Sequence, residues 1–177
     1  MKKARLATLW LDGCSGCHMS FLDLDERLVE IAGRVEVLYS PVVDAKQFPE
    51  DVDITLVEGA LANEEDIEKI RMVRSRTKLL VALGDCAVTG NVPAMRNNFL
   101  LEDVLTRGYV ENATANPGVP THEVPKLEPK VIPLHELVPV DVFVPGCPPS
   151  ADLIYFVLNE GLAGRVPDLA TKCRFGN

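Results

Sequence analysis

Residues 5–26 read RLATLWLDGCSGCHMSFLDLDE, and this stretch decides the class of fold. It begins with a nearly continuous apolar run, 5–11, which is typical of a strand covered on both faces. Cys14 and Cys17 follow among glycines, and residues 17–32 then have the pattern of a helix. The stretch therefore predicts a strand, a loop carrying two thiols, and a helix. By itself a C-x-x-C pair fits a zinc site, an iron–sulfur cluster, a disulfide or a dithiol redox couple.

The remaining sequence repeats this alternation of strand and helix. Short β-rich apolar runs predict strands at 35–41, 53–59, 78–84 and 140–146, and helical patterns predict helices at 63–75, 93–107 and 149–160. The helix at 63–75 has a good start signal, because Asn63 precedes three acidic residues. Such alternation implies βαβ units. We predict an α/β fold, a flavodoxin-like three-layer sandwich with a central parallel sheet, formed as a single domain by residues 1–177.

Residues 111–139 break this rhythm. They contain prolines at positions 117, 120, 125, 129, 133 and 139. Prolines at this spacing exclude long helices and central strands, so we expect an extended surface excursion. Long ordered loops in compact domains usually have a function, which favours a partner-docking arm over a simple loop.

Composition narrows the class of protein. With 47% hydrophobic and 25% charged residues, the chain has the make-up of a globular domain, and its net charge of −8 argues against nucleic-acid binding. No apolar run approaches the roughly 20 residues of a membrane helix. The short apolar stretch near the N-terminus ends at Asp12 without a cleavage site, so we expect no signal peptide, a cytoplasmic location and reduced cysteines.

Four of the five cysteines are expected to share one location. Cys14 and Cys17 follow the strand at 5–11, Cys86 follows the strand at 78–84, and Cys147 follows the strand at 140–146. In an open parallel sheet the carboxyl ends of the strands lie along one edge, where ligands bind. The four thiols should therefore meet at that edge. Cys173, near the C-terminus, has no partner in this scheme, and we expect no role for it at this site.

Two kinds of metal site suit four thiolates, structural zinc and a [4Fe–4S] cluster. Zinc sites usually pair two close-spaced motifs, whereas this sequence has one pair and two isolated cysteines, which favours the cluster. Cys86 and Cys147 as unrelated buried thiols remain the simpler alternative. Glycines beside the cysteines would let backbone N–H groups approach the cluster sulfides; they are Gly13, Gly16, Gly84, Gly90 and Gly146.

Three other residues lie near this edge. Glu58 ends the strand at 53–59, where it could accept hydrogen bonds from a loop backbone, approach an iron, or relay protons at a subunit interface. His18 stands at a helix start, where it could donate to a sulfide, face a partner, or simply cap the helix or face solvent. We expect Trp10, beside the cysteine loop, to pack in the core.

At this point the motifs become recognisable as a set. The C-x-x-C at 14–17, VEGAL at 57–61, GDCAVTG at 84–90 and PGCPPS at 145–150 resemble the small subunit of [NiFe]-hydrogenases. The related subunit of complex I has two adjacent cysteines in its first motif, whereas Ser15 and Gly16 separate them here, which favours the hydrogenase side. The usual small-subunit motif often has a glutamate just after the second cysteine; here His18 and Met19 stand there.

The resemblance implies a function. Typical small subunits continue into a second domain with ligands for two further clusters, and the short length here looks like the small subunit of the soluble, bidirectional, NAD-reducing hydrogenases. The four cysteines Cys14, Cys17, Cys86 and Cys147 would bind one proximal [4Fe–4S] cluster, with Glu58, His18, Gly13 and Gly146 around it. The NiFe centre would lie in a hydrogenase large subunit, and further Fe–S clusters and FMN in iron–sulfur and flavin diaphorase subunits.

Three alternatives stay open on the sequence. A flavodoxin-type FMN module shares the fold class, although the loop after the first strand is Cys-Ser-Gly-Cys rather than rich in Ser and Thr. A cluster subunit of a complex-I-like or other hydrogenase-type assembly would dock a different catalytic partner. A zinc-stabilised interaction protein would have no redox role.

Overall fold

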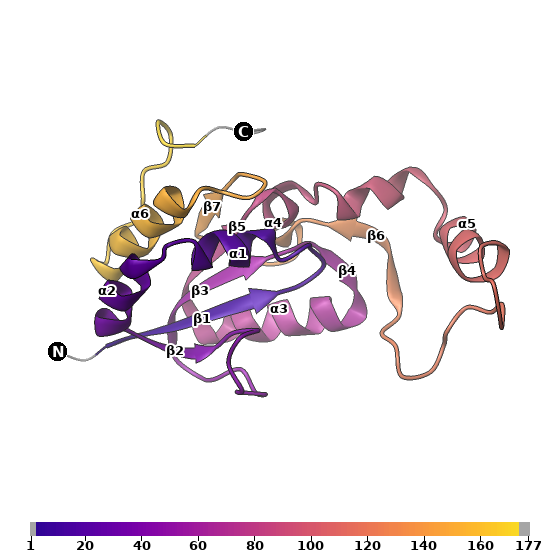
Figure 1. The fold of residues 1–177 in the computed structure, drawn as a ribbon, viewed down its shortest axis with the longest axis horizontal. Helices are drawn as coiled ribbons and strands as arrows, with labels where there is room; N and C mark the ends of the chain where they lie inside the picture. Colours follow the sequence, from indigo (N-terminus) through magenta and orange to yellow (C-terminus); the bar gives the residue numbers. More distant parts are fainter. Residues whose placement is uncertain (1–2, 174–177) are drawn as a thin grey trace.

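The computed structural model describes residues 3–173, and its centre is a five-stranded sheet (Figure 1). The strands run in the order β2-β1-β3-β5-β7, and every neighbouring pair is parallel. Their bounds are β1 (Ala4–Trp10), β2 (Val35–Tyr39), β3 (Val52–Glu58), β5 (Thr77–Leu83) and β7 (Val142–Val144). This order of parallel strands is that of flavodoxin-like folds, which confirms the predicted α/β class.

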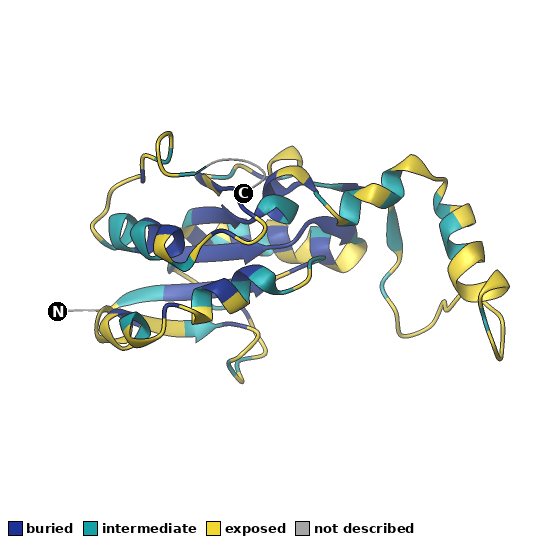
Figure 2. Ribbon diagram, turned by 45° about the horizontal axis from the view of Figure 1, so that its top comes forward, coloured by how far each residue is buried: buried dark blue, intermediate teal, exposed yellow. Residues whose placement is uncertain are grey.

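Helices cover both faces of the sheet. One face carries α1 (Gly16–Leu22), α2 (Glu26–Arg34) and α6 (Ala151–Leu162), and the other carries α3 (Glu64–Arg76) and α4 (Asp85–Thr89). Successive side chains of β5 point to opposite faces of the sheet. Val81 and Leu83 pack with the first set of helices, whereas Leu80 and Ala82 pack with the second. Figure 2 shows the buried sheet between these two layers.

The helix predicted at 63–75 is confirmed as α3, with the start that the sequence indicates. The Oδ1 atom of Asn63 accepts a hydrogen bond from the Asp66 N–H at 3.0 Å, and the Asp66 carboxylate accepts one from the Asn63 N–H at 3.3 Å. This is a capping box, which pairs two backbone groups that a helix start otherwise leaves free.

Two other predicted helices are wrong as single elements. The segment 17–32 forms α1 and α2, separated by a turn in which Leu24 enters the core and Asp25 has a φ of 50°. The segment 93–107 forms a 3₁₀ helix, η1 (Pro93–Asn98), and the short helix α5 (Leu101–Thr106), with extended backbone at Phe99 between them. A π-helical turn, η2 (Arg107–Glu111), follows.

The proline-rich excursion is partly integrated into the fold, which corrects the prediction for residues 111–139. Its second half contains β6 (Leu127–Ile132), which pairs antiparallel with β4 (Leu61–Asn63), and η3 (Leu134–Glu136), whose Leu134 is fully buried. A two-stranded sheet tolerates Pro129 because each strand has a free edge. Only the first half is an exposed excursion. With α5 and η2 it forms an arm, residues 99–126, that projects from the sheet (Figures 1 and 2).

Candidate metal centre

The carboxyl ends of β1, β5 and β7 bring four thiols into one neighbourhood. Cys14 lies in the loop after β1, Cys17 in α1, Cys86 in α4, and Cys147 just beyond β7. Burial raises the pKa of the Cys17 thiol, and the charges of Glu58, Cys86, Cys14 and Cys147 raise it further. The pKa of the Cys86 thiol is also raised by burial and by the charges of Cys147 and Cys14. The thiols are therefore close enough to act on one another electrostatically.

The four thiols range from buried to exposed. Cys17 is buried and Cys86 half-buried, whereas Cys14 and Cys147 are exposed. Among residues 3–173, no three His, Cys, Asp or Glu side chains are grouped to hold a metal ion. A cubane differs from a single ion because each of its four irons takes one thiolate, so its ligands stand around a volume. Four soft thiolates from three separate loops fit that requirement.

The loop before Cys14 is fastened to the segment that follows β3. The N–H groups of Leu11 and Asp12 donate to the carbonyls of Glu58 and Ala60, at 2.9 and 3.1 Å, and the Ala60 N–H donates back to Asp12 at 2.8 Å. Gly59 has a φ of +95°, and a side chain there would collide with the backbone of Leu11. The VEGA segment thus holds the first cysteine loop in place, a role that the sequence did not reveal.

Glycines make close contacts at this edge. A Cβ on Gly13 would lie 3.1 Å from the Cα of Gly59, and a Cβ on Gly84 would overlap the Sγ of Cys17. Gly146 has a φ of +140°, and its N–H donates to the carboxylate of Asp85 at 2.7 Å. The N–H groups of Gly84 and Gly90 are likewise engaged, by the carbonyls of Val144 and Cys86. The expectation that glycine N–H groups approach cluster sulfides stays a prediction for Gly13 and Gly16.

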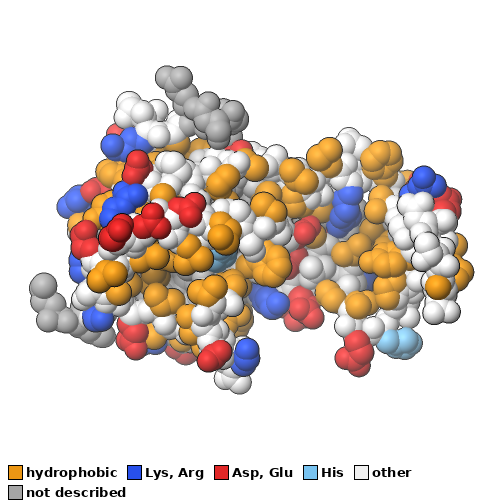
Figure 3. Space-filling view, viewed as in Figure 1, with side chains coloured by type: hydrophobic (Ala, Val, Ile, Leu, Met, Phe, Trp, Pro, Cys, Tyr) orange, Lys and Arg blue, Asp and Glu red, His pale blue; other side chains and the backbone are white. Residues whose placement is uncertain are grey.

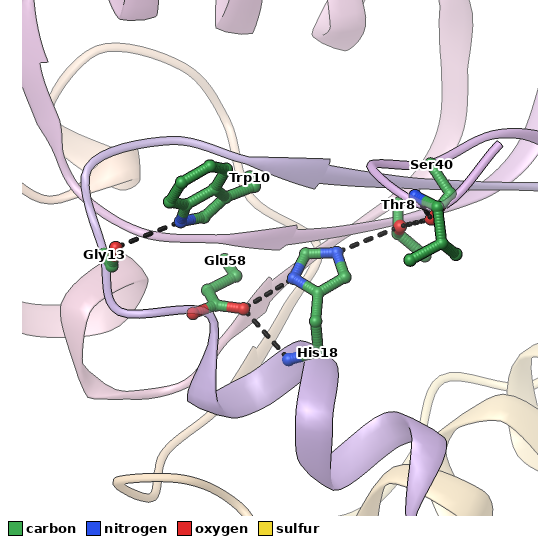
Figure 4. Close-up of polar contacts among 7 residues, drawn as sticks. Thr8, Trp10, Gly13, His18, Ser40 and Glu58 are labelled. Carbon is green, nitrogen blue, oxygen red and sulfur yellow. Dashed lines mark hydrogen bonds and ion pairs between the residues drawn. The ribbon is translucent and has the colours of Figure 1, made fainter. Parts of the chain in front are cut away.

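Glu58 and His18 form a buried polar chain with two hydroxyl groups (Figure 4). The Oε2 atom of Glu58 accepts a hydrogen bond from the His18 N–H at 2.9 Å and lies 2.5 Å from the ring Nδ1. The ring Nε2 lies 3.0 Å from the Oγ1 of Thr8, which donates to the hydroxyl of Ser40. The His18 side chain is 12% exposed and that of Glu58 2%.

These contacts bear on part of the sequence-based interpretations. Glu58 accepts from a backbone N–H, as one of them expected, but the donor is His18 in the first turn of α1 rather than a loop residue. The ring of His18 points inward to Glu58 and Thr8, so the expectation of a solvent-facing histidine is wrong. Trp10 is also corrected, because its side chain is 48% exposed and its Nε1–H donates to the carbonyl of Gly13 (Figure 4). A tryptophan at the end of a strand can leave the core once the chain turns away.

Two polar residues beside the cysteines escape sequence reasoning. Asp85 precedes Cys86 and bonds to Gly146, and the side-chain amide of Asn91 donates to the Sγ of Cys147 at 3.5 Å. Nothing in a single sequence pairs residues that lie about sixty positions apart. Cys173, for which the sequence predicts no role here, donates its thiol hydrogen to the carbonyl of Leu169 at 3.2 Å.

Comparison with known proteins identifies the family. Residues 14–160 match the family model described as NADH ubiquinone oxidoreductase, 20 Kd subunit. The delta subunit of the NAD-reducing hydrogenase HoxS of Cupriavidus necator is 46% identical over 96% of this chain and 84% of its own length. The delta subunit of sulfhydrogenase 2 of Pyrococcus furiosus is 31% identical over 92% of this chain, and there the match spans 64% of the relative's length.

Solved structures give the same result. A chain in a crystal structure of NAD⁺-reducing [NiFe]-hydrogenase in the H₂-reduced state has a TM-score of 0.93 at 42% identity, with 98% of this chain and 99% of that chain covered. A chain of the Dm. baculatum [NiFeSe]-hydrogenase has a TM-score of 0.64 at 19% identity, with 97% of this chain and 68% of that chain covered, which shows the shared fold. The chain thus belongs to the NADH ubiquinone oxidoreductase 20 Kd subunit family, where it is a hydrogenase small subunit related to those of NAD-reducing [NiFe]-hydrogenases.

Proposed function

We propose that this chain is the electron-transfer small subunit of an NAD-reducing [NiFe]-hydrogenase, and that Cys14, Cys17, Cys86 and Cys147 hold one [4Fe–4S] cluster. The observation that supports the proposal is that these four thiols follow three strand ends and lie close enough for their charges to raise the pKa of the Cys17 and Cys86 thiols. When bound, the cluster supplies a carrier for single electrons. The chain connects the NiFe site of a large subunit with iron–sulfur and flavin subunits that reduce NAD⁺.

The chain's own residues position and shield such a centre. Cys17 and Glu58 form its buried side, where the low dielectric strengthens electrostatic effects on a redox potential. Cys14 and Cys147 form its exposed side, which is where a partner subunit has to come within electron-transfer distance. The His18–Glu58 contact ties the start of α1 to the sheet, which limits the movement of Cys17.

The surface around this edge supports a partner subunit. Several large apolar side chains are exposed near the cysteine loops or at the base of the arm; they are those of Trp10, Met19, Met95, Phe99 and Leu100. Figure 3 shows hydrophobic side chains spread across the middle of the molecule and onto the arm. Apolar surface of this extent usually marks an interface, and we propose that the large subunit covers it. Within residues 3–173, no helix combines the length and the apolarity that crossing a bilayer requires.

Anaerobic purification of the tagged full-length chain with its bound partners tests this proposal. We expect nickel in a companion chain, iron in this one, and hydrogen-dependent reduction of NAD⁺ by the complex. A complex that contains iron but no nickel would contradict the hydrogenase assignment and indicate a different catalytic partner. A chain with bound flavin and no iron would contradict the cluster and support a flavodoxin-type module.

A further inference from the structure

The two loops that carry Cys86 and Cys147 are joined by a reciprocal pair of hydrogen bonds. The N–H of Asp85 donates to the carbonyl of Gly146 at 2.9 Å, and the N–H of Gly146 donates to the Oδ1 of Asp85 at 2.7 Å. Asp85 directly precedes Cys86, and Gly146 directly precedes Cys147. The pair therefore links the two residues that adjoin the two thiols.

This pair continues the sheet beyond its last strand residues. Leu83 and Val144 form the final register pair of β5 and β7, and the Gly84 N–H donates to the Val144 carbonyl at 2.8 Å. The chain at Gly146 then takes a φ of +140°, where a Cβ would lie 2.6 Å from the Cα of Pro149. Beyond this point the strands can no longer pair by backbone alone. A side-chain carboxylate, that of Asp85, takes over as acceptor.

The same loop is also in contact with a third thiol. Gly84 lies so close to Cys17 that a Cβ would overlap its Sγ. The segment 84–86 thus touches Cys17, contains Cys86 and bonds to the residue before Cys147. The position of this one segment therefore affects the positions of three of the four thiols.

We propose that Asp85 is a positioning residue that fixes the separation of Cys86 and Cys147 before a cluster binds. The inference rests on the proposed function, because it concerns ligands of the cluster proposed there. Ligand side chains must be held within about 0.5 Å of the productive geometry, which isolated loops seldom achieve. Without the carboxylate, the Gly146 N–H loses its partner, and the reciprocal pair between Asp85 and Gly146 is reduced to the one bond from the Asp85 N–H. The oxygen acceptor of Asp85, rather than its charge, is what positions the loops.

Two substitutions separate the acceptor from the charge. Asp85→Asn keeps an oxygen at the same place and removes the charge, whereas Asp85→Ala removes both. Asp44→Ala, at an exposed loop position between β2 and β3, is the matched control. Each full-length chain is purified anaerobically with its partners. The readouts are iron and acid-labile sulfide per chain, the EPR spectrum of the reduced sample, and the thermal unfolding midpoint.

We expect Asp85→Ala to lose at least half of its iron and to give a broadened EPR signal from the remainder. Asp85→Asn and Asp44→Ala should keep the iron content and line shape of the unchanged protein. If Asp85→Ala does not fold, Asp85→Asn still decides the matter, because loss of iron in that variant overturns the role of the acceptor. Full iron and an unchanged spectrum in Asp85→Ala also overturn the inference. Absence of iron from the unchanged protein instead defeats the proposed function, and the inference with it.

Discussion

His18 and Glu58 are joined twice through a single oxygen. The Oε2 atom of Glu58 receives the backbone N–H of His18 at 2.9 Å and lies 2.5 Å from the Nδ1 of its ring. One residue belongs to the first turn of α1, next to Cys17, and the other ends β3. The contact therefore anchors the helix that carries a candidate ligand to the central sheet (Figure 4).

Removal of this anchor should be costly. Glu58→Ala leaves the partly buried N–H of His18 without an acceptor, which we expect to lower the free energy of unfolding by about 1–3 kcal/mol. Glu58→Gln keeps an oxygen acceptor, so its free energy of unfolding should fall by less. Denaturant unfolding of the two variants measures the difference. An equal loss in both would show that the charge of Glu58, and not its hydrogen bonds, stabilises this region.

Gly84 should not tolerate a side chain. Gly84→Ala places a methyl group onto the Sγ of Cys17 at a φ of +85°, and the backbone strain alone costs about 1–3 kcal/mol. We expect a lower unfolding midpoint and loss of iron. Gly33→Ala is the matched control, because Gly33 lies in α2 with no atom within 4 Å of the added methyl group, and alanine there should stabilise by about 0.5–1 kcal/mol. Equal unfolding midpoints and equal iron contents in the two variants would refute the close contact between Gly84 and the Sγ of Cys17.

Asn91 should tune the potential of the proposed centre. Its amide donates to the Sγ of Cys147, and such a hydrogen bond favours the reduced, more negative state. Asn91 has a φ of 33°, so Asn91→Gly removes the donor without adding strain, and we expect the midpoint potential to fall by tens of millivolts. Asn116→Gly is the control, since Asn116 also has a positive φ but lies in the arm. Redox titration followed by EPR measures both, and an unchanged potential in Asn91→Gly would remove the amide from consideration.

Cysteine substitutions test the ligand set. We expect Cys86→Ser to keep the fold, because the side chain is half-buried and the change is small, but to abolish hydrogen-driven reduction of NAD⁺. Cys173→Ser should leave both the fold and the activity unchanged. Circular dichroism and a hydrogen-dependent NAD⁺ assay compare the two complexes. Full activity in Cys86→Ser would exclude Cys86 as a ligand.

The strands were predictable because each is a short apolar run, and their carboxyl ends follow from the parallel order. This is why the meeting of Cys14, Cys17, Cys86 and Cys147 could be expected from the sequence. The start of α3 was predictable because Asn63 and Asp66 form a local capping box. The apolar runs and the capping box were predictable because each is formed by residues that are close together in the sequence.

The remainder depends on contacts between distant segments. The strand β6 has little signal of its own, because Pro129 interrupts its pattern and its partner β4 has three residues. The turn between α1 and α2 occurs because Leu24 is buried, which the helical pattern of 17–32 conceals. The inward turn of His18 needs Glu58, which lies 40 positions further along the chain.

The count of iron and acid-labile sulfide in the anaerobically purified full-length chain tests the central claim most directly. We predict about four of each per chain, with an EPR signal on reduction. Cys173→Ser, purified in the same way, should contain the same amounts of iron and acid-labile sulfide per chain. Zinc without sulfide, or no bound metal at all, would contradict the proposal that these four cysteines hold a [4Fe–4S] cluster.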